Sequence, residues 1–132
     1  MQFKKYKNNK IKIERQVMRN KIKMKLINNY VDIYKIIFAC KFLLDRNQNA
    51  SENEVALSTL NDTLKLKNSY EQMFQKLKIA DISFLLLKRD LDKAIQVIPD
   101  SNYKPKTIIN MLEMKKEISK TLNEVLLKYL SI

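Results

Sequence analysis

The side chains best suited to chemistry are the cations of the first 25 residues, and the chemistry that they suit is the binding of an anion. Residues 1–35 hold eleven Lys and Arg against two acidic residues, a net charge of +9, whereas residues 46–132 hold fourteen against eleven, a net charge of +3. The generic partner of such a basic arm is a polyanion or an anionic membrane surface, and the alternatives are a solubilising tail or a targeting n-region. The candidate polyanion-binding residues are Lys4, Lys5, Lys7, Lys10, Lys12, Arg15, Arg19, Lys21, Lys23 and Lys25.

Two aromatic residues, Phe3 and Tyr6, lie among these cations. Mixtures of basic and aromatic side chains bind nucleic-acid strands through phosphate contacts and base stacking. The sequence contains no recognisable helix-turn-helix motif and no aromatic motif of a nucleic-acid-binding sheet. Binding of DNA or RNA by this segment is therefore expected to be weak, non-specific and sensitive to salt.

The single cysteine, Cys40, has two interpretations. A lone cysteine on an apolar helical face is commonly a small buried residue. Residues 37–40, IFAC, also resemble a relaxed bacterial lipobox, and a start at Met24 would place a leader of ordinary length before the cysteine, although Asp32 and Lys35 interrupt its apolar region. Lipidation at Cys40 would anchor the protein at the cell surface or outer membrane, and this anchor would be its only attachment to a membrane. Without lipidation we expect a cytoplasmic protein.

The sequence predicts no catalytic, cofactor-binding or metal site. It contains no His and no Gly, which excludes imidazole bases and ligands and glycine-rich phosphate loops. Glu113 and Glu117 lie four residues apart, a spacing that can begin a carboxylate metal site, but the neighbouring lysines indicate ordinary surface ion pairs. No stretch approaches the roughly eighteen apolar residues that span a bilayer. We therefore expect a protein that is not an enzyme and binds no cofactor.

The elements that carry these residues follow from hydrophobic periodicity. Apolar residues at three- and four-residue spacing predict four amphipathic helices at about residues 17–45, 54–77, 79–98 and 105–130. With no Gly and only two Pro, long helices are favoured over tight hairpins. The prediction is an all-α single domain over residues 17–132, a small up-down bundle, preceded by a basic arm over residues 1–16 that is a frayed helix or disordered.

Particular residues are expected at helix ends and on helix faces. A capping box from Ser51 to Glu54 is expected to begin the second helix, whose apolar stripe includes Lys67 with its charged end at the edge. Asp90 and Asp92 mark the solvent side of the third helix, whose start no breaker marks within residues 76–79. The expected inner residues are Ile22, Leu26, Tyr30, Ile33, Ile37, Cys40 and Leu44 in the first helix and Leu57, Leu60, Leu64, Tyr70, Met73, Phe74 and Leu77 in the second.

The C-terminal segment resembles a known family. Residues 112–129, LEMKKEISKTLNEVLLKY, are similar to the last helix region of the Borrelia virulent-strain-associated lipoprotein family, which includes complement-regulator-acquiring surface proteins and related outer-surface antigens. The similarity is collinear over about residues 55–130, and the chain is shorter than the family's usual helical domain. The matching positions are Thr59, Leu60, Leu64, Lys67, Glu71, Leu77, Leu112, Glu113, Lys115, Lys120, Thr121, Leu122, Asn123, Glu124, Leu126 and Tyr129.

The resemblance implies an all-helical surface lipoprotein, often dimeric, of a family in which some members bind host complement regulators such as factor H. It carries over no binding residue, and it implies that the core of the last helix consists of Leu112, Ile118, Leu122 and Leu126. The leading hypothesis is a non-enzymatic surface antigen, truncated or divergent, that acts in virulence and complement evasion by binding a host protein, or that self-associates as a homodimer. The rival is a cytoplasmic helical protein that binds nucleic acid through residues 1–25. A small immunity or accessory protein of a plasmid or phage is a third hypothesis.

Overall fold

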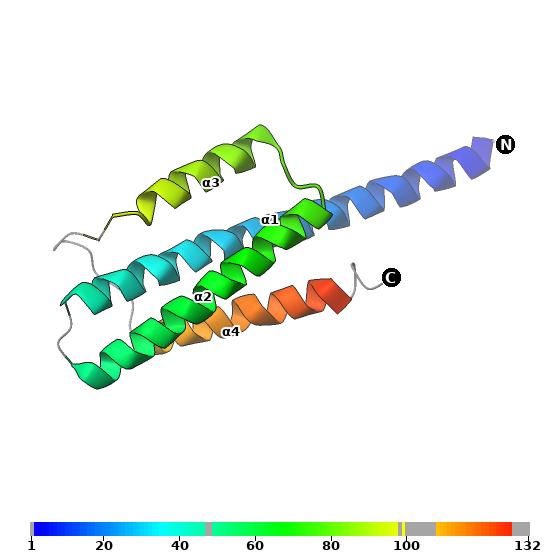
Figure 1. Cartoon of the computed structure of the whole chain (residues 1–132). Helices are drawn as coiled ribbons and strands as arrows, with labels where there is room; N and C mark the ends of the chain where they lie inside the picture. The colour runs from blue at the N-terminus through cyan, green and yellow to red at the C-terminus, as the bar shows by residue number, and fades with distance from the viewer. Residues whose placement is uncertain (1, 47–48, 98, 100–107, 128–132) are drawn as a thin grey trace.

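The computed structural model describes residues 2–46, 49–97, 99 and 108–127, with side chains from residue 9 onward, residue 108 excepted. This part of the chain forms four α-helices: α1 (Gln2–Arg46), α2 (Ala50–Lys76), α3 (Ile82–Ala94) and α4 (Ile108–Val125). Consecutive helices run in opposite directions (Figure 1). The predicted all-α fold, a small helical bundle, is confirmed.

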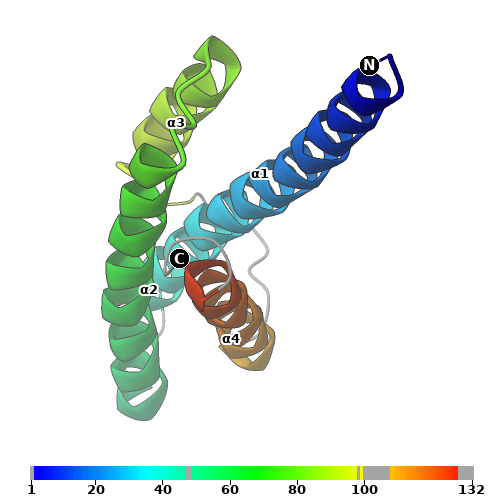
Figure 2. The same ribbon diagram turned by 90° about the vertical axis from the view of Figure 1, so that its right-hand side faces the viewer.

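Helix α1 is the element on which the others are assembled. It spans 45 residues without Gly or Pro, which corresponds to about 67 Å at 1.5 Å per residue. Helices α2, α3 and α4 all contact it, and α4 also contacts α2. The predicted helix start near residue 17 is not seen, because α1 begins at Gln2 and the basic arm forms its first turns. This N-terminal half projects beyond the end of α2 and diverges from the other helices (Figures 1 and 2).

The predicted inner face of α1 is confirmed in its second half. Leu26, Tyr30, Ile33, Ile37 and Cys40 are each 0% exposed. Ile22 and Leu44, at the two ends of the stripe, are partly buried. Three-and-four spacing keeps these side chains on one side of the helix, where α2 and α4 cover them.

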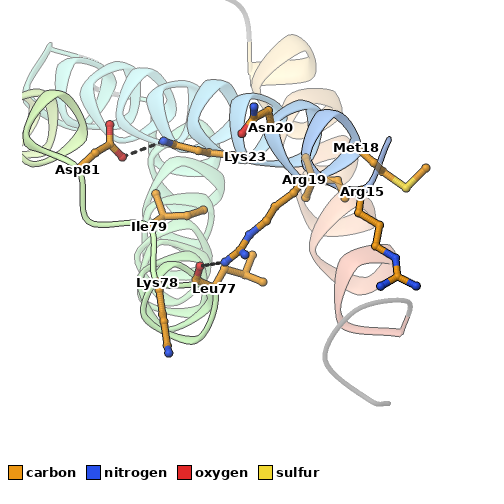
Figure 3. A pocket seen from close by; sticks show the side chains of 10 residues that line it. Arg15, Met18, Arg19, Asn20, Lys23, Leu77, Lys78, Ile79 and Asp81 are labelled. Carbon is orange, nitrogen blue, oxygen red and sulfur yellow. Dashed lines mark hydrogen bonds and ion pairs between the residues drawn. The ribbon is translucent and has the colours of Figure 1, made fainter. Parts of the chain in front are cut away.

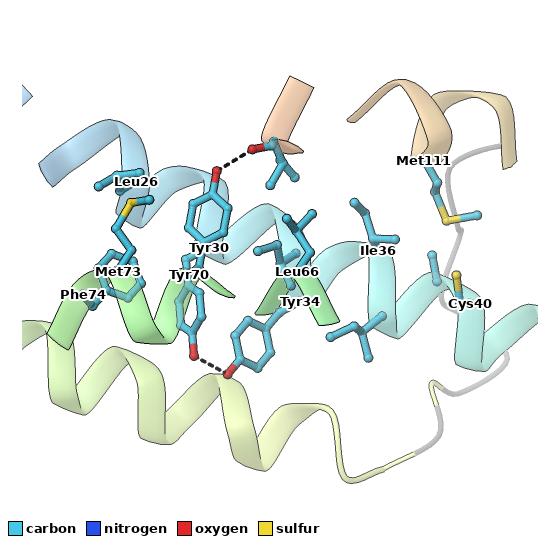
Figure 4. Packing of buried hydrophobic residues seen from close by; sticks show 14 of the residues in the cluster. Leu26, Tyr30, Tyr34, Ile36, Cys40, Leu66, Tyr70, Met73, Phe74 and Met111 are labelled. Atoms are coloured by element: carbon cyan, nitrogen blue, oxygen red, sulfur yellow. Dashed lines mark hydrogen bonds between the residues drawn. The ribbon is translucent and has the colours of Figure 1, made fainter. Parts of the chain in front are cut away.

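Aromatic rings from three helices pack together in the core, and Figure 4 shows Tyr30, Tyr34 and Phe74 among them. The Tyr30 ring lies edge-on to Phe74, with centroids 5.2 Å apart, and edge-on to Tyr34, with centroids 5.1 Å apart. Phe84, the buried residue of α3, packs on Phe74 with centroids 4.7 Å apart. Edge-on aromatic pairs contribute beyond the area that they bury. The cluster therefore fastens α2 and α3 to the same point of α1.

The start of α2 differs from the prediction. The N-cap is Asn49, whose side-chain oxygen accepts hydrogen bonds from the backbone N–H groups of Ser51 at 3.0 Å and Glu52 at 3.2 Å. Ser51 lies inside the first turn, so the predicted capping box from Ser51 to Glu54 is wrong. Asn is as good an N-cap as Ser, and Ala50 after it has the highest helix propensity, so the helix starts four residues before the predicted position 54.

The inner face of α2 was predicted correctly in its second half, and in its first half the prediction holds for the partly buried Leu60 but fails for Leu57 and Leu64. Tyr70, Met73 and Phe74 are buried as predicted, but Leu57 is 51% exposed and Leu64 is 40% exposed. The residue before each of these leucines faces the core instead, and it is small. Small side chains at these positions allow α2 to approach α1 closely. The buried residues of the first half are Ala56, Thr59, Thr63 and Leu66.

The junction between α2 and α3 is a Schellman motif with a lysine in the position that glycine usually takes. Lys78 has φ 56°, in the left-handed region. The Ile79 N–H donates to the Phe74 carbonyl at 2.9 Å and the Lys78 N–H donates to the Gln75 carbonyl at 3.2 Å. A non-glycine residue there costs about 1 kcal/mol, and the chain has no glycine to offer. The usual sequence signal of a helix end is therefore missing.

Helix α3 is shorter than predicted. Helix α3 covers residues 82–94 of the predicted 79–98, and Pro105 and Tyr129, in the predicted last helix, lie outside the described residues. In α4, Ile118 is buried and Leu122 partly buried, as the family resemblance implied. Leu112 and Leu126 are each 37% exposed, so their assignment to the core was wrong. A stripe at seven-residue spacing covers α1 and α2 in their place, formed by Met111, Ile118 and Val125 with Thr121 beside it.

Candidate functional site

The candidate site is the N-terminal half of α1, which carries charge and over which no helix of the described residues packs. Every side chain from residue 9 to residue 21 is exposed. Over residues 9–28 the chain holds seven cations against the single acidic residue Glu14. The side chains of Lys4, Lys5 and Lys7, and those of Phe3 and Tyr6, lie outside the described residues. The predicted cations that are described are Lys10, Lys12, Arg15, Arg19, Lys21, Lys23 and Lys25.

Three of these cations continue the core stripe of α1. Counting back from Ile22 in steps of three, four and three residues gives Arg19, Arg15 and Lys12. The stripe is thus apolar where α2 and α4 cover it and cationic where they do not. Lys10 and Lys21 lie on another side of the helix, since eleven residues correspond to about three full turns. The cations therefore surround the helix.

A cleft of about 550 Å³ lies where the projecting half of α1 passes the α2–α3 junction (Figure 3). Its α1 wall comes from residues 15–23 and its other wall from residues 77–81. The apolar lining residues are Met18, Ile22, Leu77 and Ile79, and the cations are Arg15, Arg19, Lys23 and Lys78.

Two polar contacts hold the walls of the cleft together. The Arg19 guanidinium donates to the Leu77 carbonyl oxygen at 3.0 Å, at the C-terminus of α2, where a cation is favoured by the helix dipole. Lys23 Nζ lies 2.9 Å from Asp81 Oδ1. A hydrogen bond from Ser83 and the contact with Lys23 lower the pKa of Asp81 to about 2. Asp81 is therefore ionised at neutral pH and keeps Lys23 in place.

A second cluster of charges lies between α2 and α3. The Tyr34 hydroxyl donates a short hydrogen bond to Asp92. Lys88 lies 3.3 Å from Asp92 and 3.4 Å from Glu71, and Lys67 lies 2.8 Å from Glu71 and 3.8 Å from Asp92. With two ammonium groups and two carboxylates, the cluster is neutral and its charges are paired. It has the composition of a structural network that fastens α3 to α2, with no charge left for a ligand.

The predictions for this cluster were right for some residues and wrong for Asp92. Asp92 is half-buried in the cluster, so its assignment to the solvent side of α3 was wrong. Asp90 is exposed as predicted. Lys67 extends from the apolar stripe to the edge of the bundle as predicted, and there it meets Glu71. Burial opposes ionisation of the Tyr34 phenol and raises its pKa above the usual range.

Cys40 lies in the core of the bundle. Burial raises the pKa of its thiol to about 11, so the group is a neutral thiol at physiological pH. Met111 of α4 belongs to the same buried cluster, and both residues are labelled in Figure 4. The predicted burial is confirmed. Cleavage before Cys40 would remove Leu26, Tyr30 and Ile33, each fully buried in the same core, and lipid attachment at Cys40 stays a prediction.

Two further properties concern the described part of the chain. Among these residues no group of three or more Cys, Asp or Glu is arranged to hold a metal ion, and Glu113 and Glu117 do not form such a group. No helix within the same residues is long and apolar enough to cross a membrane.

No family model, no curated protein and no solved structure matches this chain. The resemblance to the Borrelia lipoproteins therefore rests on the sequence pattern alone. Sequence reasoning found the cations of α1, but it missed the cleft that three of them share with Lys78 and Asp81. The positive φ of Lys78 brings these residues together, and no residue type marks it in advance.

Proposed function

We propose that this protein binds double-stranded DNA non-enzymatically and without sequence specificity, through the projecting half of α1. The observation that carries the proposal is the exposure of every side chain from residue 9 to residue 21 on a helix that has cations on several sides and Glu14 as its one acidic residue there. Cations placed in this way neutralise phosphates and release counterions, which is the main source of non-specific affinity.

The shape of the element favours duplex DNA over RNA. A single helix, about 10–12 Å across, fits the major groove of B-DNA, which is about 12 Å wide. Cations on opposite sides of that helix, such as Lys12 and Lys21, would then face the phosphates of both strands. The major groove of A-form RNA is too deep and narrow for side chains to enter. RNA duplexes are therefore expected to bind more weakly.

The burial of Cys40 favours this function over the surface-lipoprotein hypothesis. A lipid anchor there requires loss of residues 1–39, and with them most of the α1 core. The DNA-binding function uses the whole of α1 as one continuous helix. The basic residues of the projecting half lie outside the bundle, so their contact with a large polyanion would leave the core undisturbed.

The test is fluorescence anisotropy of a labelled random duplex with the full chain. The variant Lys10→Gln/Lys21→Gln removes two cations from the projecting half, and Lys116→Gln/Lys120→Gln removes two exposed cations from α4 as a control of equal net charge. We expect the α1 pair to weaken binding about tenfold or more and to lower the slope of log K against log salt by about two. We expect the α4 double variant to change neither the affinity for DNA nor the salt slope by much.

Three results would contradict the proposal. They are absence of duplex binding at about 50 mM salt, affinity that does not fall between about 50 and 200 mM salt, and equal weakening by the α1 and α4 pairs. The affinity for a duplex RNA of the same length tests the role of groove shape. Tighter binding of that RNA would contradict the major-groove placement.

A second candidate function is that of a helical surface antigen that binds a host protein such as a complement regulator, or that self-associates. The observation that favours it is a set of large apolar side chains exposed on α3, on α4 and just after α4: Ile82, Leu85, Leu86, Ile109 and Leu127. Exposed apolar groups of this kind suit a protein partner. Palmitate labelling of the wild-type chain that is lost in Cys40→Ala would support this candidate, and labelling that persists in Cys40→Ala would exclude a lipid anchor at this residue.

A further inference from the structure

The cleft between α1 and the α2–α3 junction has properties that DNA binding does not use. At about 550 Å³ it is within the range of small-molecule sites, and it is far too small for a nucleic-acid duplex. Its walls are held by Arg19 on Leu77 and by Lys23 on Asp81, at 3.0 and 2.9 Å. The Schellman motif at Lys78 fixes the second wall. The cleft is therefore a defined feature of the fold.

The charge of the cleft is strongly positive. Four cations and the single carboxylate of Asp81 give a net charge of +3. The side chains of two of the cations, Arg15 and Lys78, have neither a hydrogen bond nor an ion pair with any residue that the structure describes. Arg19 uses one N–H donor on Leu77, and a guanidinium carries five. In Figure 3 Arg19 reaches across the cleft, and Arg15 and Lys78 extend outward at its rim, where their donors are available to an anionic group.

The remaining lining is apolar. Met18 and Ile22 come from α1, and Leu77 and Ile79 from the opposite wall. Ile22, Leu77 and Ile79 are partly buried and pack against the core cluster, so they form the inner part of the cleft. Met18 is 57% exposed and lies at its edge. Apolar side chains beside unpaired cations indicate a ligand that has both an apolar body and an anionic group.

We propose that this cleft binds a small amphipathic anion, a medium-chain carboxylate, with its chain against Met18, Ile22 and Ile79 and its head group on Arg15 and Arg19. A guanidinium pairs with a carboxylate through two parallel hydrogen bonds, which sets the orientation of the head group. Removal of the alkyl chain from water onto the apolar lining supplies the rest of the affinity. A cationic ligand is disfavoured by the net charge of the cleft.

The experiment is titration of the full chain with decanoate, below its micelle concentration, followed by calorimetry and by backbone amide shifts. Two variants alter the cleft: Arg15→Gln removes a cation, and Met18→Gln removes apolar surface. Their matched controls lie on the same helix outside the cleft. Lys21→Gln removes the same charge, and Met24→Gln changes a residue that is 54% exposed, close to the 57% of Met18.

We expect decanoate to shift the amides of residues 77–81, and each cleft variant to raise the Kd about tenfold while the two controls leave it within about twofold. All four positions are exposed, so the helical ellipticity and Tm of the variants should match those of the wild-type chain. Equal effects of the cleft variants and the controls, or absence of decanoate binding, would overturn the proposal. Equal affinity for inorganic phosphate and decanoate would overturn it as well, because the apolar lining would then have no role.

Two further experiments distinguish decanoate binding in the cleft from binding of other anionic partners, a membrane surface or DNA. Phosphatidylcholine vesicles with one-third phosphatidylglycerol test whether the ligand is a membrane surface. Vesicle binding without decanoate binding would overturn the cleft site in favour of a peripheral membrane helix. The Lys10→Gln/Lys21→Gln variant, designed to weaken DNA binding, should keep wild-type affinity for decanoate. The DNA-binding proposal and the cleft proposal can therefore fail independently.

Discussion

The two halves of α1 belong to one unbroken helix and have opposite surroundings. From Ile22 to Leu44 the inner stripe is apolar and covered by α2 and α4. From Arg19 back to Lys12 the same stripe is cationic and exposed. The backbone is helical in both, and neither half contains Gly or Pro. The difference between the halves therefore lies entirely in the side chains and in what covers them.

This comparison separates helix formation from helix burial. Helix formation depends on local backbone hydrogen bonds and on residue propensities. The helix therefore runs through residue 17, its predicted start, without a break. Stability comes from packing, because a helix of about 20 residues without a partner is marginal in water. The projecting half is helical largely because it extends a helix already fixed by the core. Four predictions test how sharply the two halves differ, from the largest expected effect to the smallest.

The largest effect is expected at Tyr30, the centre of the aromatic cluster. Tyr30→Ala leaves a cavity between α1, α2 and α3 and should lower the free energy of unfolding by about 3–5 kcal/mol. Val17→Ala, on the projecting half, should change it by less than about 0.5 kcal/mol. Urea denaturation followed by circular dichroism measures both. Similar losses for the two variants would show that the projecting half is packed in solution.

Proline substitution tests the two halves at exposed positions. Lys35→Pro breaks the packed half and should lower the free energy of unfolding by about 3 kcal/mol or more, since an interior hydrogen bond is lost and the ring clashes with the preceding turn. Gln16→Pro makes the same change at an exposed position of the projecting half, over which no helix of the described part packs. It should reduce helical ellipticity while leaving the urea midpoint near that of the wild-type chain. A large shift of that midpoint by Gln16→Pro would mean that the two halves unfold as one cooperative unit.

A smaller effect is expected at Tyr70, which links three helices. Its hydroxyl donates to the Ile118 carbonyl oxygen at 2.7 Å and accepts from Asn29 Nδ2 at 3.2 Å. Tyr70→Phe should lower the free energy of unfolding by about 1–2 kcal/mol, because the buried hydrogen bond to Ile118 and the part-buried one from Asn29 are both lost. Asn29→Ala should cost less in the Tyr70→Phe background than in the wild-type chain. Equal costs would show that the Asn29–Tyr70 bond contributes nothing to stability.

The smallest effect is a pH dependence that arises in the Asp92 cluster. Burial acts to raise the pKa of Asp92, but the hydrogen bond from Tyr34 and the nearby Lys88 and Lys67 outweigh it, so the pKa is lowered overall. A lowered pKa stabilises the folded state above the unfolded value of about 3.9, and this stabilisation is lost as the pH falls through the folded value.

We therefore expect the urea midpoint to fall between about pH 5 and pH 3 by more in the wild-type chain than in Asp92→Asn. Asp90→Asn is the control, because Asp90 lies on the same helix and is exposed. An acid dependence in Asp92→Asn as steep as in the wild-type chain would exclude this cluster as its source. The projecting half of α1 should contribute little, since Glu14 is its only acidic residue from Gln2 to Lys25.

Much of the fold was predictable because periodicity is a local property. Leu26, Tyr30, Ile33, Ile37 and Cys40 were assigned to the core from their spacing alone, and all are fully buried. The assignments that failed depended on which of two adjacent faces meets a partner. Spacing permits Leu57 or Ala56 on the inner side of α2, and the larger residue was chosen. The close approach of α2 to α1 selects the smaller one, and a single sequence does not show that distance.

The candidate site was predictable in part for the same reason. The net charge of residues 1–35 indicated a polyanion partner without any structure. The cleft beside it depends on residues some sixty positions apart, such as Arg19 and Leu77, and on the left-handed backbone of Lys78. Lys is not a residue that favours this conformation, so its presence there gave no warning. Contacts at such a distance along the chain follow from the tertiary packing.

The amino-acid sequence by itself determined that this protein is helical, that α1 has an apolar inner stripe, and that its N-terminal half is cationic. These properties follow from residue types and spacing within single helices. The tertiary structure decided which part of α1 is covered, which neighbour of each leucine is buried, that Asp92 lies in a charge cluster, and that a cleft forms at Lys78. Those outcomes depend on where one helix ends beside another, because burial and pairing are properties of two surfaces together.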